Sequence, residues 1–245
     1  MPEADHPAMR RGERMRMHVG TSGYAYKEWK PAFYPQELAA PAMLRFYAER
    51  LGTVEINNTF YRMPSKKVLQ GWCAEVPAAF RFAVKATRRV THFKRLRDVG
   101  SELDFLFGNL AALEGRLGPV LFQLPPNLAI DIPLLQDFLA QMPPHIQSVL
   151  EFREPSWFDD AVYSLLRQNG VALCAMEEVD AEAHLVPTAK FGYFRLRRGL
   201  YSAVELGAWA DRIRAQPWDE AFVYFKHDTA APNLALEFVR AAGVE

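Results

Sequence analysis

Six short apolar runs along this chain share one feature: each reaches a charged or amide side chain in the same alternating phase. The runs cover residues 54–57, 82–85, 120–123, 150–153, 193–196 and 224–228. Because successive side chains of a strand point to opposite faces, the apolar set can pack outward while the polar set points the other way. The polar set comprises Glu55, Asn57, Lys85, Gln123, Glu151, Arg153, Arg195, Lys226 and Asp228.

Short β-rich runs alternate with longer runs of helical period along most of the chain, which indicates a parallel sheet with helical crossovers. We expect strands at 17–20, 53–57, 80–85, 119–124, 148–152, 171–176, 191–196 and 221–226. An open doubly wound sheet would gather polar strand ends mainly at its switch point, so polar ends on six strands favour a closed barrel. The predicted fold is therefore α/β, a TIM-like (β/α)8 barrel whose polar strand ends meet at one mouth.

Helices are expected between most of these strands. Leu44, Tyr47 and Leu51 share one helical face, Ser65 can cap a helix that buries Val68, Leu69 and Trp72, and further helices begin near Ser101 and Pro133. The remaining helices are expected at 159–168, 204–215 and 233–242. About fourteen residues with Pro187 separate the sixth and seventh strands, so the helix there is short or missing.

Length and charge restrict the class of protein. A chain of 245 residues with a net charge of zero fits one barrel domain, expected at 15–245, and has no global field toward DNA or an anionic membrane. No apolar run approaches a membrane span, and residues 1–14 are polar, so we expect a mobile N-terminal tail and no membrane partner. Cys73 and Cys174 lie on apolar elements without metal spacing, as expected for buried thiols in a reducing cytoplasm.

Three residues of the polar set are candidate catalytic groups. Glu55 and Glu151 can act as acid and base if their surroundings separate their pKa values. Lys85, with the small Ala83 two residues before it, could form a Schiff base. The alternative for all three is structural, because barrel interiors hold ion pairs and Glu55 could neutralise Lys85. A divalent metal is a weaker possibility, since no HxH or HExxH spacing occurs.

Cationic residues around the predicted mouth favour an anionic ligand. Arg153, Arg195 and Lys226 can bind phosphate or carboxylate, and Asn57, Gln123 and Asp228 add polar contacts. The segment 85–97 carries six Lys and Arg residues and no acidic residue, so it could bind phosphates, including those of a nucleic acid. His92, inside this segment, is either a surface histidine or, alternatively, a phosphate contact or general acid. A solvated charged loop is the alternative for the whole segment.

Aromatic residues follow three of the predicted strands. They are Tyr24, Tyr26, Trp29, Phe33, Tyr34, Phe60, Tyr61, Trp157 and Phe158. Rings at a barrel mouth can stack on sugars or nucleobases, and Tyr24, Tyr61 and Trp157 are the candidates for ligand contact. Equally, the rings can form a hydrophobic cap over the barrel.

Several segments together resemble the YecE-like family, whose domain is known as domain of unknown function 72. The matching segments are residues 20–24, 33–35, 54–61, 82–85, 91–92, 122–126, 151–153 and 156–157. The resemblance implies a TIM-like barrel, distantly similar to those of endonuclease IV and xylose isomerase, and implies no activity. The chain departs from the family pattern Arg-x-His-Gly at residues 195–199, and Lys226, His227 and Asp228 replace paired asparagines after the eighth strand.

Three functions fit these observations. The first is a hydrolase or lyase that acts on an anionic substrate containing a sugar or nucleotide, without a predicted cofactor. The second is a nucleic-acid-binding module without turnover that uses the segment 85–97. The third is a Schiff-base lyase that acts through Lys85.

Overall fold

Eight parallel strands close into a barrel in the computed structural model, which describes residues 15–177 and 183–244. The strands are β1 (Arg16–Ser22), β2 (Thr53–Ile56), β3 (Arg81–Lys85), β4 (Leu117–Gln123), β5 (Ser148–Glu151), β6 (Ala172–Glu177), β7 (Phe191–Leu196) and β8 (Glu220–Phe225). Each strand pairs with its neighbour in sequence, and β8 pairs with β1 to close the ring. The TIM-like fold predicted from the polar strand ends is confirmed. The predicted tail at 1–14 lies outside the described residues.

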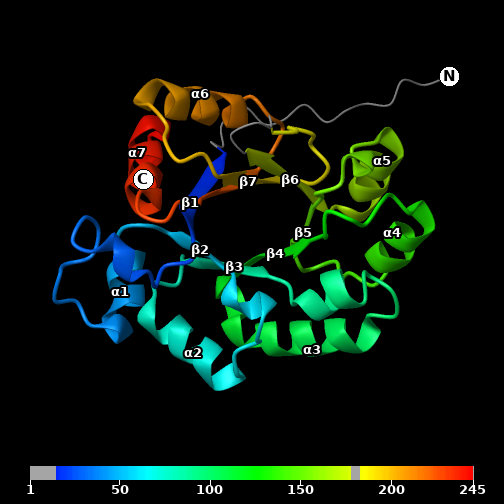
Figure 1. Cartoon of the computed structure of the whole chain (residues 1–245), viewed down its shortest axis with the longest axis horizontal. Helices are drawn as coiled ribbons and strands as arrows, with labels where there is room; N and C mark the ends of the chain where they lie inside the picture. The colour runs from blue at the N-terminus through cyan, green and yellow to red at the C-terminus, as the bar shows by residue number, and fades with distance from the viewer. Residues whose placement is uncertain (1–14, 178–182, 245) are drawn as a thin grey trace.

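Within the described residues, seven α-helices surround the barrel (Figure 1). They are α1 (Met43–Ala48), α2 (Lys66–Glu75), α3 (Gly100–Leu110), α4 (Ile132–Leu139), α5 (Asp160–Asn169), α6 (Ala203–Arg214) and α7 (Ala231–Ala242). In the described residues 183–190 no helix lies between β6 and β7, and α5 and α6 flank the gap that this leaves in the ring (Figure 1). None of the described helices combines the length and the apolar character of a membrane span.

Local sequence signals fix several helix ends. The Ser65 side chain accepts a hydrogen bond from the Val68 amide at the start of α2, as its position before the helix predicts. Gly170 adopts a left-handed conformation after α5, which a residue without Cβ accepts readily. One prediction in this region is wrong: Val68 is 45% exposed, because α2 turns its inward stripe toward Leu69 instead.

Two apolar layers stabilise the barrel. Outward-facing strand residues pack on the helices in the larger core, whereas a smaller cluster fills the barrel interior with Leu121, Val149, Tyr193, Phe222 and Tyr224 among its members. This interior cluster occupies the middle of the barrel. The polar strand ends therefore lie above a packed floor and not over an open pore.

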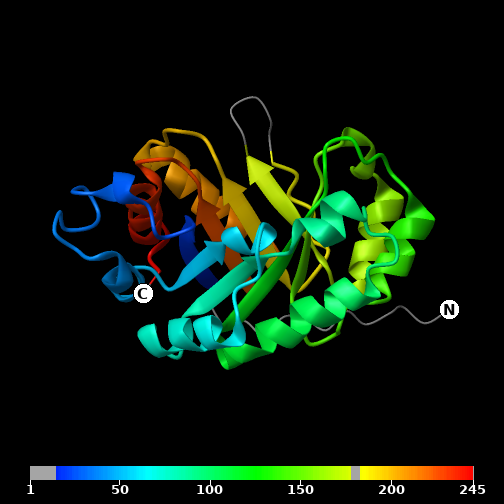
Figure 2. The ribbon, with the colours of Figure 1, turned by 60° about the horizontal axis from the view of Figure 1, so that its bottom comes forward.

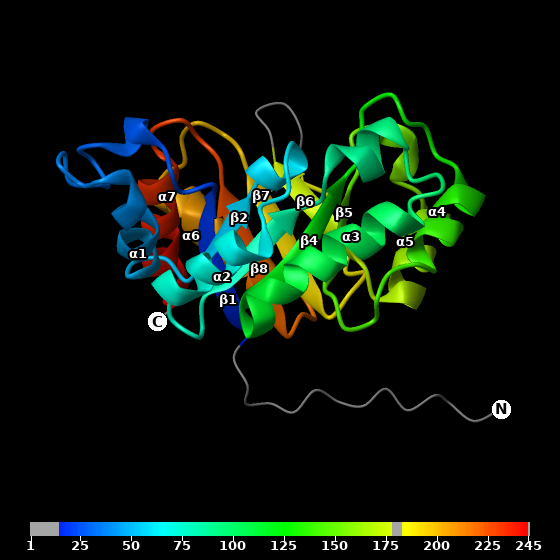
Figure 3. The same cartoon turned by 90° about the horizontal axis from the view of Figure 1, so that it is seen from below.

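The strand arrows lead to one end of the barrel, as the tilted view of β6 and its neighbours shows (Figure 2). We call this end the mouth. In the side view, the loops after the strands gather at the mouth and the C-terminus lies toward the opposite end (Figure 3). The residues predicted to share one site thus lie at the same end of the barrel, the mouth.

Candidate functional site

The polar ends of neighbouring strands lie at matching heights in the barrel. Ser22 of β1 is in register with Glu55 of β2, and Gln123 of β4 is in register with Glu151 of β5. Because parallel strands present the same face at matching positions, these side chains meet above the interior cluster. The convergence that alternation predicts is therefore present.

Glu55 is completely buried and its carboxylate is fully hydrogen-bonded. Its Oε2 accepts hydrogen bonds from Ser22 Oγ at 2.6 Å, Asn57 Nδ2 at 2.8 Å and Arg195 Nη2 at 2.9 Å. Its Oε1 accepts from the Tyr193 hydroxyl at 2.8 Å. A buried carboxylate with this many donors is held in one orientation.

Glu151 is buried in the same way on the other side of Arg195. Its Oε1 accepts from Gln123 Nε2 at 2.7 Å and from Arg153 Nε at 2.6 Å. Its Oε2 accepts from Arg195 Nη1 at 2.7 Å. Arg195 therefore bridges Glu55 and Glu151, and this buried carboxylate–arginine–carboxylate group forms the centre of the site.

Both carboxyl groups are held in the ionised form. Burial alone would raise the pKa of each, but the Arg195 charge and the hydrogen bonds outweigh it. The pKa of Glu55 is lowered, and that of Glu151 falls to about 2. Neither group can donate a proton near neutral pH, and their oxygens are already occupied by protein donors.

Lys85 lies beside this group. Its Nζ donates to Gln123 Oε1 at 2.8 Å and lies 4.2 Å from the centre of the Phe60 ring. Burial, followed by the repulsion of Arg195, lowers the pKa of Lys85 to about 8, although Glu151 and Glu55 oppose the shift. About a tenth of the amine is then neutral at pH 7, far more than for an ordinary lysine.

His92 lies on the same side of the mouth as Lys85. Its ring packs edge-on against Phe60 with 4.9 Å between ring centres, and its Nδ1 lies 2.8 Å from Thr91 Oγ1. Partial burial lowers the pKa of His92, and the charges of Lys85 and Arg95 lower it further. The imidazole is therefore mainly neutral at pH 7 and can accept a proton.

The remaining residues predicted to contact a ligand differ from one another in how far they are exposed. Tyr61 is 70% exposed at the rim, Tyr24 is half-buried, and Lys226 and Asp228 are exposed just beyond β8. Trp157 does not line the mouth, contrary to expectation. It is fully buried, with its Nε1 donating to the Leu128 carbonyl at 2.6 Å.

Some of the other aromatic residues after the strands are also interior, whereas Tyr24, Phe60 and Phe158 are half-buried and Tyr26 and Tyr61 are exposed. Trp29 and Tyr34 are buried, and Trp29 Nε1 donates to the Asp228 carbonyl at 3.0 Å. Trp157 stacks on Phe152 with 4.8 Å between ring centres. The buried rings hold the loops at the mouth against the barrel, as the hydrophobic-cap alternative predicts, whereas Phe60 and Tyr61 are partly or largely exposed at the mouth.

The basic segment 85–97 is largely paired within the protein. Its partners are Glu102 for Lys94 and Arg89, Asp131 for Arg97, and the Asn127 carbonyl for Arg95. Arg88 differs from these, because its guanidinium lies over the rings of Tyr61 and Phe93. The segment thus offers fewer available cations than its sequence suggests.

Sequence reasoning missed two partners of Glu55. Ser22 and Tyr193 both donate to its carboxylate. Tyr193 stands two residues before Arg195 on β7, so the alternation that identified Arg195 also places Tyr193 inward. The signal was present, but an uncharged residue within an apolar run did not stand out.

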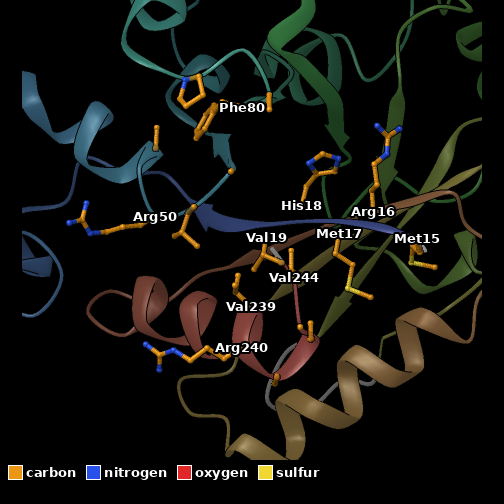
Figure 4. Close-up of a pocket in the computed structure, with 18 of the residues that line it drawn as sticks. Met15, Arg16, Met17, His18, Val19, Arg50, Phe80, Val239, Arg240 and Val244 are labelled. Carbon is orange, nitrogen blue, oxygen red and sulfur yellow. The ribbon is translucent and has the colours of Figure 1, made fainter. Parts of the chain in front are cut away.

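The described residues contain no group of three or more His, Cys, Asp or Glu side chains arranged to hold a metal ion. A large open groove lies elsewhere, at the opposite end of the barrel from the mouth. It has a volume of about 1060 Å³ and lies between the start of β1, with His18 and Val19, and the end of α7, with Val239 and Arg240 (Figure 4). The mouth itself is a set of convergent groups above a packed floor.

The family model for the protein of unknown function DUF72 matches residues 18–245. The chain belongs to the DUF72 family. A crystal structure of a DUF72 family protein from Thermotoga maritima is 25% identical, with a TM-score of 0.83 over 92% of this chain and 98% of that one. A DUF72 family protein from Enterococcus faecalis has a TM-score of 0.80 at 17% identity, over 94% of this chain and 96% of that one, which shows the shared fold.

Among curated relatives, the UPF0759 protein YecE of Escherichia coli K12 is 28% identical over 116 residues. The match spans 47% of this chain and 43% of YecE. None of these descriptions of DUF72 proteins states a substrate or a reaction, so the site geometry is the basis for a functional proposal.

Arg198, in the loop after β7, has a clear structural role. Arg198 Nη2 pairs with Glu205 of α6 at 2.6 Å, and its Nε lies 3.5 Å from Glu177 at the end of β6. Tyr201 also donates to Glu177, at 2.6 Å. Arg198 thus ties β6, α6 and the loop between β7 and α6 together.

Proposed function

We propose that this DUF72 protein is an enzyme of the lyase type, which acts on a small anionic carbonyl or sugar compound at the barrel mouth through Lys85. The single observation behind the proposal is that the polar side chains of the mouth differ in how far hydrogen bonds within the protein occupy them. Arg195, Tyr193 and the amide side chains occupy both carboxylates, whereas Lys85 has one hydrogen bond and faces the mouth. We therefore assign the chemical step to Lys85, whose amine this hydrogen-bond network leaves available.

The site supports the hydrolase hypothesis less well than it supports a lyase. Hydrolysis by a carboxylate pair needs one carboxyl group that carries a proton and one that is free to act as base or nucleophile. Glu55 and Glu151 have lowered pKa values and share Arg195. We therefore infer that they position Lys85 and Gln123 and balance charge, and that they do not transfer protons.

The mouth favours anions. Neighbouring cations contribute to the lowered pKa values of Lys85, His92 and Lys226, after desolvation in each case. Bases whose pKa values are lowered by nearby arginine and lysine charges indicate a positive potential, which a phosphate or carboxylate on the ligand would relieve. Arg195 does not bind the ligand in this proposal, because it is buried between the two glutamates.

The proposed step is imine formation followed by cleavage. The lone pair of neutral Lys85 Nζ forms a bond to the substrate carbonyl carbon, and the carbonyl oxygen leaves as water with the uptake of one proton. The resulting protonated imine accepts the electron pair of an adjacent carbon–carbon bond. The carbon at the other end of that bond carries a hydroxyl group and becomes a carbonyl carbon. His92 takes the proton of this hydroxyl group.

Borohydride trapping tests this proposal. Pyruvate, glycolaldehyde phosphate and dihydroxyacetone phosphate are each incubated with the protein and sodium borohydride, and the adduct is located by peptide mass spectrometry. We expect an adduct on Lys85 that is absent in Lys85→Gln and retained in Lys190→Gln, which removes an exposed lysine just before the start of β7, away from the mouth. No adduct with any of the three, or an adduct that survives Lys85→Gln, would contradict the proposal.

The nucleic-acid-binding module that uses all of segment 85–97 is less well supported. Lys94, Arg97 and Arg95 have partners within the protein, so a phosphate backbone would have to compete with them. The same segment contributes Arg88 to a different surface, outside the mouth.

A further inference from the structure

Three side chains at the rim of the mouth form an exposed stack of rings and charge, which we call the rim patch: Tyr61, Arg88 and Phe93. The Arg88 guanidinium lies 5.5 Å from the centre of the Tyr61 ring and 5.0 Å from that of Phe93. Tyr61 is 70% exposed and Phe93 is 65% exposed. Single exposed apolar residues are common on protein surfaces, but exposed rings that gather in one patch with polar groups around them can mark an interaction site.

The rim patch comes from two different loops. Tyr61 follows β2, and Arg88 and Phe93 follow β3. Phe60 connects the patch to the mouth, because its ring lies 5.1 Å from Tyr61 between centres and 4.2 Å from Lys85 Nζ. A continuous row of rings and cations therefore leads outward from the mouth.

Charge in this part of the sequence is strongly one-sided. Residues 58–97 contain ten Lys and Arg residues and one acidic residue, Glu75, although the whole chain carries 29 of each sign. Arg62, Lys66 and Lys67 are exposed beside Tyr61, and none has an acidic partner among the residues that the structure describes. They can neutralise phosphates without breaking an internal ion pair.

A shallow hollow lies next to Tyr61. It has a volume of about 350 Å³, and Met63, Phe105 and Leu106 give it apolar walls. Its polar lining consists of Thr87, Ser101 and the ion pair between Arg89 and Glu102. A flat heterocycle stacked on Tyr61 could enter it, with polar groups within reach at its edge.

We propose that the rim patch binds single-stranded nucleic acid, by stacking bases on Tyr61 and Phe93 while Arg62, Lys66 and Lys67 contact the phosphates. Exposed rings interleaved with unpaired cations are the arrangement that sequence-tolerant single-strand binding requires. A duplex hides the faces of its bases, so the rings select the single strand. This function is independent of Lys85 chemistry.

Fluorescence anisotropy with a labelled oligothymidylate of about 16 nucleotides tests the proposal. We expect Tyr61→Ala and Phe93→Ala each to weaken binding by about 5- to 150-fold, the range for loss of one stacked base. Tyr61→Phe keeps the ring and should bind like the wild type. Both truncated side chains are exposed, and circular dichroism checks that the fold is retained.

Salt dependence separates the phosphate contacts from the stacking. Replacing Arg62, Lys66 and Lys67 together by Gln should reduce the slope of log affinity against log salt by about 2. The matched control replaces three exposed cations elsewhere on the barrel, Lys190, Arg212 and Arg240, and should leave affinity and slope unchanged.

Four results would overturn the proposal. They are no binding by the wild type at low salt, equal affinity for Tyr61→Ala, tighter binding of a duplex of the same length, and equal competition by oligoglutamate. The last result would assign the patch to an acidic protein partner.

Discussion

Arg195 is the residue on which the charge balance of the barrel interior depends. Its guanidinium is 3% exposed and contacts both Glu55 and Glu151. Removing one partner of a buried ionic group leaves charge without compensation, which costs more than the group itself contributes. The energetic importance of Arg195 thus follows from its two partners and not from its own burial.

We predict that Arg195→Met lowers the free energy of unfolding at pH 7 by about 3–5 kcal/mol, measured by urea denaturation. Arg198→Met is the matched control, because Arg198 also contacts two glutamates but is 28% exposed. It should cost under about 1 kcal/mol. Equal losses in the two variants would contradict the role assigned to Arg195.

The same pair of glutamates predicts a pH dependence. Their pKa values are lower in the folded protein, so the stability they contribute is present above the unfolded pKa and is lost as pH falls toward the folded values, about 2 for Glu151. Arg195→Met removes this effect. The difference in unfolding free energy between the wild type and Arg195→Met should therefore be larger at pH 7 than at pH 4; a constant difference would be evidence against it.

Lys85 gives a prediction that needs no substrate. Its pKa of about 8 implies that the rate of modification by an acylating reagent rises with pH and levels off above about 8, while ordinary lysines continue to gain reactivity toward pH 10. Mass spectrometry can follow Lys85 and the exposed Lys190 in the same sample. A parallel rise at the two lysines up to pH 10 would contradict the lowered pKa.

At the scale of elements, the close approach of β1 and β2 depends on a residue without a side chain. A Cβ on Gly20 would lie 2.0 Å from the Thr53 carbonyl oxygen and 3.0 Å from the Tyr47 hydroxyl. Thr53 is paired with Gly20 across the two strands, and Tyr47 bonds to both strands. The obstacle is backbone, so a methyl group cannot be accommodated by a rotamer change.

We predict that Gly20→Ala lowers the free energy of unfolding by about 1–3 kcal/mol, as other overpacked sites do. Gly52→Ala is the control from the turn before β2, where nothing lies within 4 Å of the added Cβ. It should change stability by under about 0.5 kcal/mol. Denaturation of both variants by urea gives the comparison, and an unaffected Gly20→Ala would show that the strands separate at little cost.

The positions of strands and helices could be predicted from the sequence more accurately than the contacts that their side chains make. Alternation places β7 at the same residues as the structure, and the other strands to within a few residues, because a strand between helices must be apolar outward. The helix face at Val68 was wrong although its cap was right: the inward stripe runs through Leu69 and Trp72, and Val68 lies about 100° around the helix from Leu69. Trp157 was wrong for a different reason: whether a ring faces solvent depends on the Leu128 loop, which is distant in sequence.

For the whole molecule, the two ends of the barrel differ in chemistry. At the mouth, Lys85 and His92 have lowered pKa values and few hydrogen-bond partners. At the other end, Glu220 accepts from His18 at 3.1 Å and from Gln147 at 2.7 Å, and its pKa is lowered by the bond from His18. Sequence alternation predicted which groups gather at the mouth, but not that Arg195 would bind both glutamates and leave Lys85 as the available group.

This difference predicts that stability and reactivity can be changed separately. Glu220→Gln should lower the free energy of unfolding by about 1.5–3 kcal/mol, the value of hydrogen bonds to a charged group, and leave the modification rate of Lys85 unchanged. Lys85→Gln should abolish borohydride trapping and change stability by under about 0.5 kcal/mol, because a functional amine held away from its preferred charge state stabilises little. Urea denaturation and mass spectrometry on both variants measure the four quantities. A large loss of stability in Lys85→Gln would mean that Lys85 serves the fold, and the mouth would then hold a structural ion network instead of a site for chemistry.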